Sequence, residues 1–422
     1  MRWNLTPEKK LFLTNFINYG IFQASKYVVP LITVPFIIHV IGVEKFGIVS
    51  LAQGLANYLR VGVDYGWNIL GVQYIARSQH HADERDRIVN TILVQQLLLS
   101  GIAFLILLAL IGIFPKLQTH WGVFIAAFGL VPANMLMVPW FFVGMQKVRY
   151  LNRAFLFSRL LYVVLIVLFL KPLEHMIWVP VFNSLSLFIG GAIVLVTLRK
   201  RFAVQFFLPR WQQLKQFFRE GWPIFLSYFS TNFYRNSQVL ILALFVNDYF
   251  LGIYSAAEKI IKVIQGTFMP LSQTIYPILA RKYVESRNRA FVALKKAIWV
   301  LGSLAFVVSI GVIVTAPLLI KVIVGQNNAD GVKLLWIGSG VIFFGVLNYI
   351  LGVLFLTNFG YKVLFSRAVF ITGIWGIFSC FVLSYFFQAF GAMGSFTLAE
   401  IFLFIMLSVF SIRKKRVLLS EK

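Results

Sequence analysis

The sequence has few charged residues and almost no cysteine. Only 13% of its 422 residues are Asp, Glu, Lys or Arg, whereas a soluble globular chain contains about 25%. This composition excludes an ordinary water-soluble protein. The single cysteine, Cys380, lies in an apolar run, so no intramolecular disulfide can form. The 14 acidic residues are outnumbered by 39 Lys and Arg, which gives a formal charge of +25.

Sequence motifs of common enzymes are also missing. The five histidines fall at the ends of apolar runs or between them, and no two have the spacing of a metal site on one helix (His39, His80, His81, His120 and His175). No Gly-rich phosphate loop, zinc motif or nucleophile elbow occurs. We therefore expect a protein that is not an enzyme, with no catalytic residues, no bound metal and no cofactor.

Long apolar runs dominate the sequence. Hydrophobic residues make up 59% of the chain, and its mean hydropathy is +0.83. Crossing a bilayer as a helix takes about 20 mostly apolar residues. Twelve runs meet this length, near 12–39, 45–75, 89–114, 120–145, 152–170, 176–198, 217–246, 250–280, 291–320, 332–357, 363–388 and 393–412. The sequence predicts an all-α integral membrane protein with twelve transmembrane helices.

Lys and Arg are distributed unevenly between successive loops. If the N-terminus is cytoplasmic, basic residues gather in the cytoplasmic segments and are rare in the outer loops. This alternation is the positive-inside rule, and it predicts that both termini are cytoplasmic. Most of the positive charge then serves to orient the helices in the membrane. We expect no nucleic-acid binding, because no large basic soluble domain is present.

An internal repeat divides the chain. FGIVSLAQGL at 46–55 aligns with LGIYSAAEKI at 251–260. Both copies begin on the same side of the membrane, so the repeat is parallel. We expect two pseudo-symmetric six-helix lobes around a central cavity. The predicted parts are the lobes at 1–198 and 217–412, a basic amphipathic cytoplasmic linker at 199–216, suited to a helix on the inner leaflet, and a basic cytoplasmic tail at 413–422.

Charged and amide side chains interrupt several apolar runs. A charge costs about 2.5–3.5 kcal/mol at the bilayer centre, so each should face protein or water. In the first, second and eighth runs, polar residues recur at helical spacing and share one face. The predicted site comprises five cations (Lys26, Arg60, Arg235, Lys259, Lys262), three carboxylates (Asp64, Glu258, Glu400) and six amides (Gln23, Gln53, Asn57, Asn68, Gln265, Gln273). A water-filled cavity between the lobes would accommodate all of them.

Two of these cations have a carboxylate one helical turn away. Arg60–Asp64 and Glu258–Lys262 are each four residues apart, so each could be a self-satisfied pair with a structural role. Cancelling these pairs leaves three cations, Lys26, Arg235 and Lys259, against Glu400. A cavity with this net positive charge predicts an anionic ligand.

Two blocks of sequence carry a family resemblance. The block QASKYVVPLITVPFIIHVIGVEKFGIVSLAQGLANYLRVGVDYGWNILGVQYIA, at 23–76, resembles the N-terminal signature of the Wzx-type O-antigen flippases. These are polysaccharide transporters of the multidrug/oligosaccharidyl-lipid/polysaccharide (MOP) superfamily. GIYSAAEKIIKVIQGTFMPLSQTIYPILAR, at 252–281, is similar to the matching segment of their second half, and TLAE at 397–400 to an acidic position in their last span. The resemblance covers nearly the whole chain.

The resemblance implies a substrate and a mechanism. The substrate would be an undecaprenyl-pyrophosphate-linked oligosaccharide, moved by alternating access from the cytoplasmic to the periplasmic leaflet of the bacterial inner membrane. The cations would bind phosphate or acidic sugars, and the carboxylates would gate, form ion pairs or carry a coupling proton. A coupling sodium ion is left open. Membrane lipids and other polysaccharide-assembly membrane proteins are the expected partners.

Two other functions fit parts of the pattern. A drug or small-cation exporter of the same superfamily would share the fold, but such a protein prefers a net negative cavity. A membrane-embedded glycosyl or acyl transferase is the other alternative, and analysis of the product would decide it. A membrane glycan polymerase or ligase would need a sizeable outer loop, and the longest outer interruption lies near 321–331. The sequence therefore favours the transporter of lipid-linked oligosaccharides.

Overall fold

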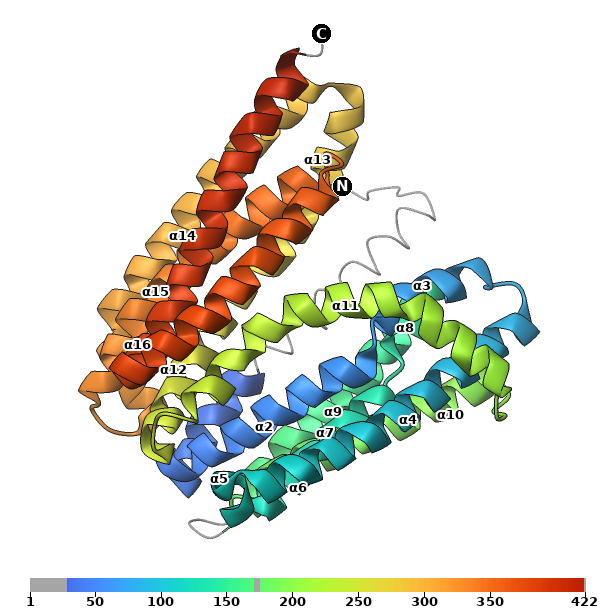
Figure 1. Ribbon diagram of the computed structural model, residues 1–422, viewed down its shortest axis with the longest axis horizontal. Coiled ribbons are helices and arrows are strands. Elements are labelled where there is room, and N and C mark those ends of the chain that lie inside the picture. Colours follow the sequence, from blue (N-terminus) through green and yellow to red (C-terminus); the bar gives the residue numbers. More distant parts are fainter. Residues whose placement is uncertain (1–28, 171–174, 421–422) are drawn as a thin grey trace, which may run out of the picture. The chain divides into compact units, whose positions relative to one another are not determined.

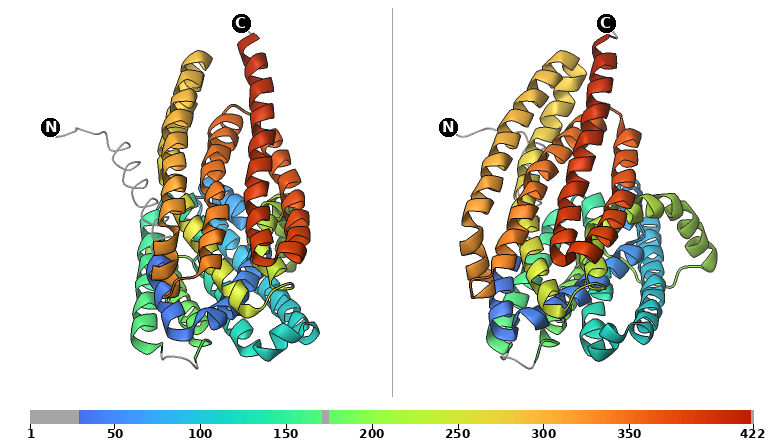
Figure 2. Two further views of the ribbon diagram at one scale, coloured as in Figure 1. Left: turned by 90° about the vertical axis from the view of Figure 1, so that its left-hand side faces the viewer. Right: turned by 60° about the vertical axis from the view of Figure 1, so that its left-hand side comes forward.

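The computed structural model describes the backbone of residues 29–170 and 175–420. Within these ranges the side chains are described except those of residues 227–236, 270, 272–274, 277, 284, 287 and 414–420. Every regular element in this part of the chain is a helix, as Figures 1 and 2 show. The predicted all-α class is confirmed.

The described residues form two compact units by their contacts. Of the described residues, unit 1 comprises Val29 and Ile48–Asn232, and unit 2 comprises Pro30–Gly47 together with those from Phe233 onward. In the described residues the chain passes between the units inside three helices: Val29–Ile41, α2 (Val43–Asp64) and α11 (Trp211–Leu242). The two membrane lobes at 1–198 and 217–412 stay a prediction.

Unit 1 contains eight further helices. They are α3 (Trp67–Arg77), α4 (Ala82–Ile113), α5 (Pro115–Thr119), α6 (Trp121–Phe128), α7 (Leu130–Met135), α8 (Pro139–Gly144), α9 (Val148–Phe169) and α10 (Trp178–Phe202). Helix α9 packs along α10, and α3 packs on α8. The run predicted at 120–145 is divided into α6, α7 and α8. Val138 takes a left-handed conformation (φ 43°), and Pro139 then begins α8, where its missing N–H is tolerated.

Unit 2 begins at Pro30, inside a short helix that spans Val29–Ile41. Its other elements are α12 (Asp248–Gly266), α13 (Phe268–Glu285), α14 (Arg287–Val324), α15 (Ala329–Tyr349), the π-helix η1 (Ile350–Thr357) and α16 (Lys362–Ser420). Helices α14, α15 and α16 pack side by side in that order (Figure 2). The last two predicted runs both lie in α16, which kinks at Gln388 (φ 51°, ψ −130°).

The run predicted at 45–75 is two helices, because Tyr65 and Gly66 separate α2 from α3. Both residues have positive φ, 46° and 79°, a region that costs a non-glycine residue energy. Packing against α11 compensates at Tyr65. Its ring stacks on Phe225 with centroids 4.7 Å apart, and its hydroxyl donates to the carbonyl oxygen of Phe218 at 3.1 Å.

The linker is not a single helix. Helix α10 continues to Phe202, Ala203 adopts a left-handed conformation (φ 52°), and α11 begins only at Trp211. The predicted surface helix over 199–216 is therefore wrong. The intervening residues 203–210, called the strap below, belong to no helix, and side chains of α4 form hydrogen bonds with their backbone.

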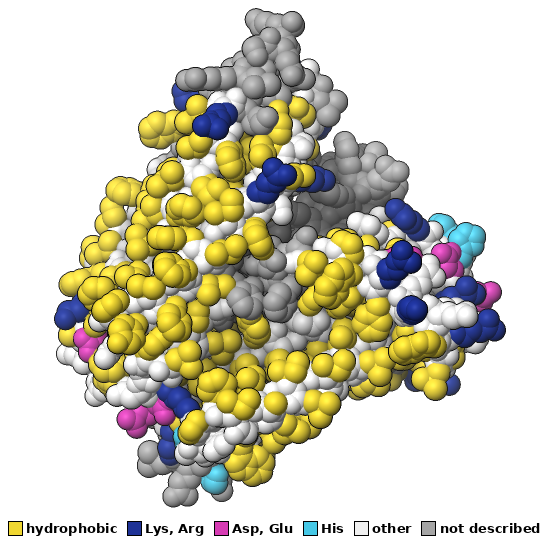
Figure 3. Space-filling view, in the orientation of Figure 1, with side chains coloured by type: hydrophobic (Ala, Val, Ile, Leu, Met, Phe, Trp, Pro, Cys, Tyr) yellow, Lys and Arg dark blue, Asp and Glu magenta, His cyan; other side chains and the backbone are white. Residues whose placement is uncertain are grey.

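Seven helices in the described ranges are long and apolar enough to cross a membrane. They are α4, α6–α8, α9, α10, α14, α15 with η1, and α16. Helix α14 leaves large apolar side chains exposed, including Trp299 at 69% and Val314 at 72%. On the face in Figure 3, hydrophobic side chains cover a broad area. Such surface is stable against lipid, so the chain is a multi-pass membrane protein.

The repeated segments meet at a close crossing of α2 and α12. A β-carbon on Gly252 would overlap the carbonyl oxygen of Val43, and one on Gly47 would overlap that of Asp248. Val43 and Gly47 occupy the same places in the first copy of the repeat as Asp248 and Gly252 in the second. The contact is therefore reciprocal. Both glycines are required for the two backbones to approach this closely.

Candidate functional site

The polar face of α2 contains an ion pair. Arg60 Nη1 lies 2.6 Å from Asp64 Oδ2, and Arg60 Nε donates to Asn57 Oδ1 at 3.5 Å. Asp64 is buried and Arg60 is half-buried. Gln53 continues this face, whereas Asn68 lies on α3, beyond the break at Tyr65 and Gly66. The single stripe predicted from spacing is therefore interrupted before Asn68.

Helix α12 carries three charged residues within five positions. Lys262 Nζ lies 2.8 Å from Glu258 Oε1. The carboxylate end of this pair is buried and the ammonium end is not, with 7% and 35% of the two side chains exposed. Lys259 Nζ lies 4.4 Å from the ring centroid of Phe46, a cation–π contact. Lys262 has a weaker contact of the same kind, 5.9 Å from the Phe396 ring.

Glu400 is held by an asparagine of the neighbouring helix. Asn348 Nδ2, on α15, donates to Glu400 Oε2 at 2.6 Å and to the Glu400 backbone oxygen at 2.9 Å. Glu400 is only 3% exposed. Gln265 connects α12 to the same helix, because its Nε2 donates to the carbonyl oxygen of Val341 at 3.4 Å. Polar side chains thus join α12, α15 and α16 inside unit 2.

The structure describes most of the predicted site. Unit 1 holds Arg60, Asp64 and the amides of α2 and α3, and unit 2 holds the charged residues of α12, Gln265 and Glu400. Lys26 and Gln23 lie outside the described residues. Arg235 and Gln273 lie on α11 and α13, but their side chains are outside the described set. The shared cavity and the roles of all these residues stay predictions.

Two polar residues of the helices escaped the sequence analysis. Asn348 could not be recognised from the sequence, because it is a single amide in an apolar run and no other polar residue lies at helical spacing from it. Arg159 lies inside the run predicted at 152–170 and about three turns into α9, but it was not among the predicted site residues. Its Nη1 donates to Asn183 Oδ1 on α10 at 3.2 Å, and its guanidinium lies 4.8 Å from the Phe155 ring. The sequence feature that could have identified Arg159 is its position inside a predicted apolar run.

The α12 cluster presents ammonium groups beside aromatic rings, which suits an anionic, hydroxyl-rich ligand. Among the described residues, no group of three or more His, Cys, Asp or Glu could hold a metal ion.

Comparison with known proteins gives the family. The family model described as polysaccharide biosynthesis protein matches residues 12–283. A protein of Escherichia coli (strain K12), provisionally named as an O-antigen transporter, is 25% identical over 90% of this chain and 91% of its own length. A protein of Shigella dysenteriae with the same name is 24% identical over 93% of this chain and 97% of its own.

The fold also has counterparts among solved structures. An inward-facing multidrug resistance transporter of the MATE family, in the MOP superfamily, superposes with a TM-score of 0.68 at 14% identity, covering 96% of each chain. These findings confirm the resemblance to the Wzx-type members of that superfamily. Because the family model spans well over half of the sequence, the chain belongs to the polysaccharide biosynthesis protein family.

Proposed function

We propose that this protein is a flippase for a lipid-linked oligosaccharide of the O-antigen type. The substrate, attached to undecaprenyl pyrophosphate, would pass from the cytoplasmic to the periplasmic leaflet of the bacterial inner membrane. The proposal includes twelve spans with both termini in the cytoplasm and alternating access between the two leaflets. The named O-antigen transporters among its relatives and the family match support it.

The observation that carries the proposal is the pair of lysines on α12. Lys259 and Lys262 place two ammonium groups on one helix of unit 2, where Lys262 Nζ lies 2.8 Å from Glu258 Oε1 and Lys259 Nζ lies 4.4 Å from the ring centroid of Phe46. A pyrophosphate carries negative oxygens that accept charge-assisted hydrogen bonds from such groups. Cationic drugs would be repelled there. The polyprenyl tail can remain in lipid while the headgroup is bound.

The other predicted residues take supporting roles in this mechanism. Arg60, with Lys26 and Arg235, would add cations to the passage, and the amides would bind sugar hydroxyls. Glu400, held by Asn348, would gate or carry a coupling proton.

Neutralising Lys259 tests the proposal. A charge-assisted contact contributes about 1.5–3 kcal/mol, so Lys259→Ala is expected to lower transport by about tenfold or more. Lys259→Arg, which keeps the charge, should retain more activity. The measurement is surface polysaccharide in a strain lacking the gene, at matched protein level. Lys295→Ala removes an exposed lysine of α14 and serves as the control.

Full restoration of surface polysaccharide by Lys259→Ala would contradict this role. Two further readouts separate the other functions. Accumulation of organic cations would indicate a drug exporter. A changed covalent structure in labelled lipid-linked sugar, after incubation with purified protein, would indicate a transferase, because a flippase leaves its substrate unchanged.

A further inference from the structure

The strap is fixed against the first turns of α4 by side chains. The Gln205 amide donates to Asp86 Oδ2 at 3.0 Å, across 119 residues of sequence. Asn90 then binds the strap twice. Its Nδ2 donates to the Gln205 carbonyl oxygen at 2.7 Å, and its Oδ1 accepts from the Phe207 amide at 3.0 Å. Because Asp86 and Asn90 are buried, the strap is part of the folded unit and has a defined position.

Two more hydrogen bonds attach α4 to the chain just before and just after the strap. Arg85 Nη2 donates to the carbonyl oxygen of Phe202 at 2.8 Å, where α10 ends. Gln95 Nε2 donates to the carbonyl oxygen of Leu214 at 2.8 Å, in the first turn of α11. The strap therefore runs along α4 from the level of Arg85 to that of Gln95.

This path places the strap at the edge of the hydrocarbon. The uncharged part of α4 runs from Ile88 to Ile113. Counted back from Ile113, where the helix ends, a bilayer core about 30 Å thick reaches Val94. Gln95, and Leu214 with it, then lie at the boundary. Arg87 lies about 10 Å outside it and Asp83 about 16 Å outside it, measured along the helix. The strap occupies the headgroup layer of the leaflet that the basic loops mark as cytoplasmic.

Apolar side chains of the strap fit this position. Leu208 is 86% exposed, and Trp211, at the start of α11, is 70% exposed. In water such exposure would be unfavourable, whereas at the membrane surface leucine inserts among acyl chains and tryptophan prefers the interface.

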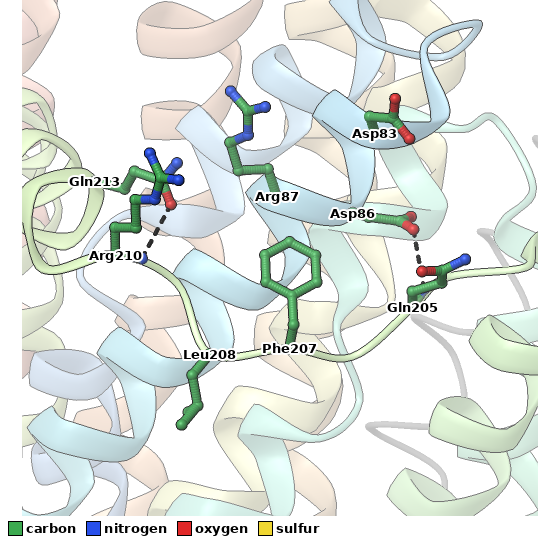
Figure 4. A pocket seen from close by; sticks show the side chains of 8 residues that line it. All are labelled: Asp83, Asp86, Arg87, Gln205, Phe207, Leu208, Arg210 and Gln213. Atoms are coloured by element: carbon green, nitrogen blue, oxygen red, sulfur yellow. Dashed lines mark hydrogen bonds between the residues drawn. The ribbon is translucent and has the colours of Figure 1, made fainter.

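A cavity of about 380 Å³ lies between the strap and the start of α4. It is lined by Asp83, Asp86, Arg87, Gln205, Phe207, Leu208, Arg210 and Gln213 (Figure 4). Two guanidinium groups and two carboxylates therefore face one space, and their formal charges cancel.

The charges are separated within the cavity. Across Figure 4 the side chains run from Arg210 and Gln213, through Arg87 and Phe207, to the two aspartates. Asp86 is already engaged by the Gln205 amide. In the described part of the chain, Asp83, Arg87 and Arg210 form no ion pair, although Asp83 and Arg87 are one turn apart on α4. The cavity has a positive end and a negative end, each with charge available to a ligand.

We propose that this cavity binds the headgroup of an ethanolamine phospholipid. Its phosphate lies against Arg87 and Arg210, and its ammonium lies against Asp83. The depths agree with this orientation, since Asp83 lies one turn further from the hydrocarbon than Arg87 and the ethanolamine follows the phosphate outward. Leu208 and the Phe207 ring contact the start of the acyl chains. The inference does not depend on which substrate the protein transports.

Native mass spectrometry of the purified, delipidated full chain tests the proposal. Phosphatidylethanolamine is titrated against phosphatidylglycerol with the same acyl chains. Wild type should bind the ethanolamine lipid at least about fivefold more tightly, since each charge-assisted contact contributes more than 1 kcal/mol. Asp83→Asn should remove this preference, and Arg87→Gln with Arg210→Gln should weaken both lipids. Lys200→Gln, an exposed change on α10 outside the cavity, should alter neither.

Three results would overturn the proposal. One is equal or tighter binding of phosphatidylglycerol by wild type. Another is an unchanged lipid preference in Asp83→Asn. The third is a loss in Lys200→Gln as large as that in the double arginine variant, which would indicate non-specific attraction to the basic surface. All substituted side chains are exposed, so a melting temperature close to that of wild type is expected for each variant and is measured alongside.

Discussion

Replacing Gly252 by alanine is expected to destabilise the protein and to abolish most of its transport. The new β-carbon would overlap the carbonyl oxygen of Val43, a backbone atom that no rotamer change can move away. Overpacking of this kind costs about 1–3 kcal/mol. The melting temperature in detergent and surface polysaccharide in a complemented deletion strain measure the two effects. Because the contact is reciprocal, Gly47→Ala should produce the same losses.

Gly311→Ala provides the matched control for these variants. Gly311 lies inside α14, and a β-carbon there would meet no atom within 4 Å. In a helix interior alanine is favoured over glycine by about 0.5–1 kcal/mol, so this variant should be as stable as wild type or slightly more so. If Gly252→Ala behaved like Gly311→Ala, the crossing of α2 and α12 would not be close.

Replacing Asn348 by leucine is expected to lower stability by about 1–3 kcal/mol, the cost of withdrawing a donor from a buried polar group. The variant removes both hydrogen bonds to Glu400, at 2.6 Å and 2.9 Å, in a place where Glu400 is 3% exposed. Thermal unfolding followed by tryptophan fluorescence measures the loss.

A double-mutant cycle isolates this interaction. Asn348→Leu combined with Glu400→Gln should cost less than the sum of the single changes, because residues in contact are not additive. Asn288→Leu, at an exposed position of α14, should have little effect. Strict additivity of the two single changes would mean that Asn348 and Glu400 are energetically independent.

Hydropathy and helical spacing predicted the features that depend on nearby residues. The apolar runs of α4, α9, α10 and α14 lie close to their expected positions, since a membrane helix is specified by its own composition. The four-residue spacing of Arg60 and Asp64 indicated a local pair, and their side-chain atoms lie 2.6 Å apart. Such features need no knowledge of the neighbouring helices.

Features that depend on distant contacts could not be predicted in this way. The break between α2 and α3 places Tyr65 at positive φ, which a tyrosine adopts only because Phe218 and Phe225 of α11 hold it there. The strap is not helical because Asp86 and Asn90 form the hydrogen bonds with its backbone that a helix would otherwise supply. The basic and aromatic composition of this segment is equally compatible with an amphipathic helix, so composition alone could not predict the strap.

The crossing of α2 and α12 also bears on how the chain originated. In a symmetric homodimer, if one residue contacts a second on the partner, the second contacts the first in return. Gly47 with Asp248, and Gly252 with Val43, obey this rule within a single polypeptide. Two identical subunits meeting across a two-fold axis would make the same contact. A gene fusion joining them would have required no new interface here, and neither glycine could enlarge as the two copies diverged.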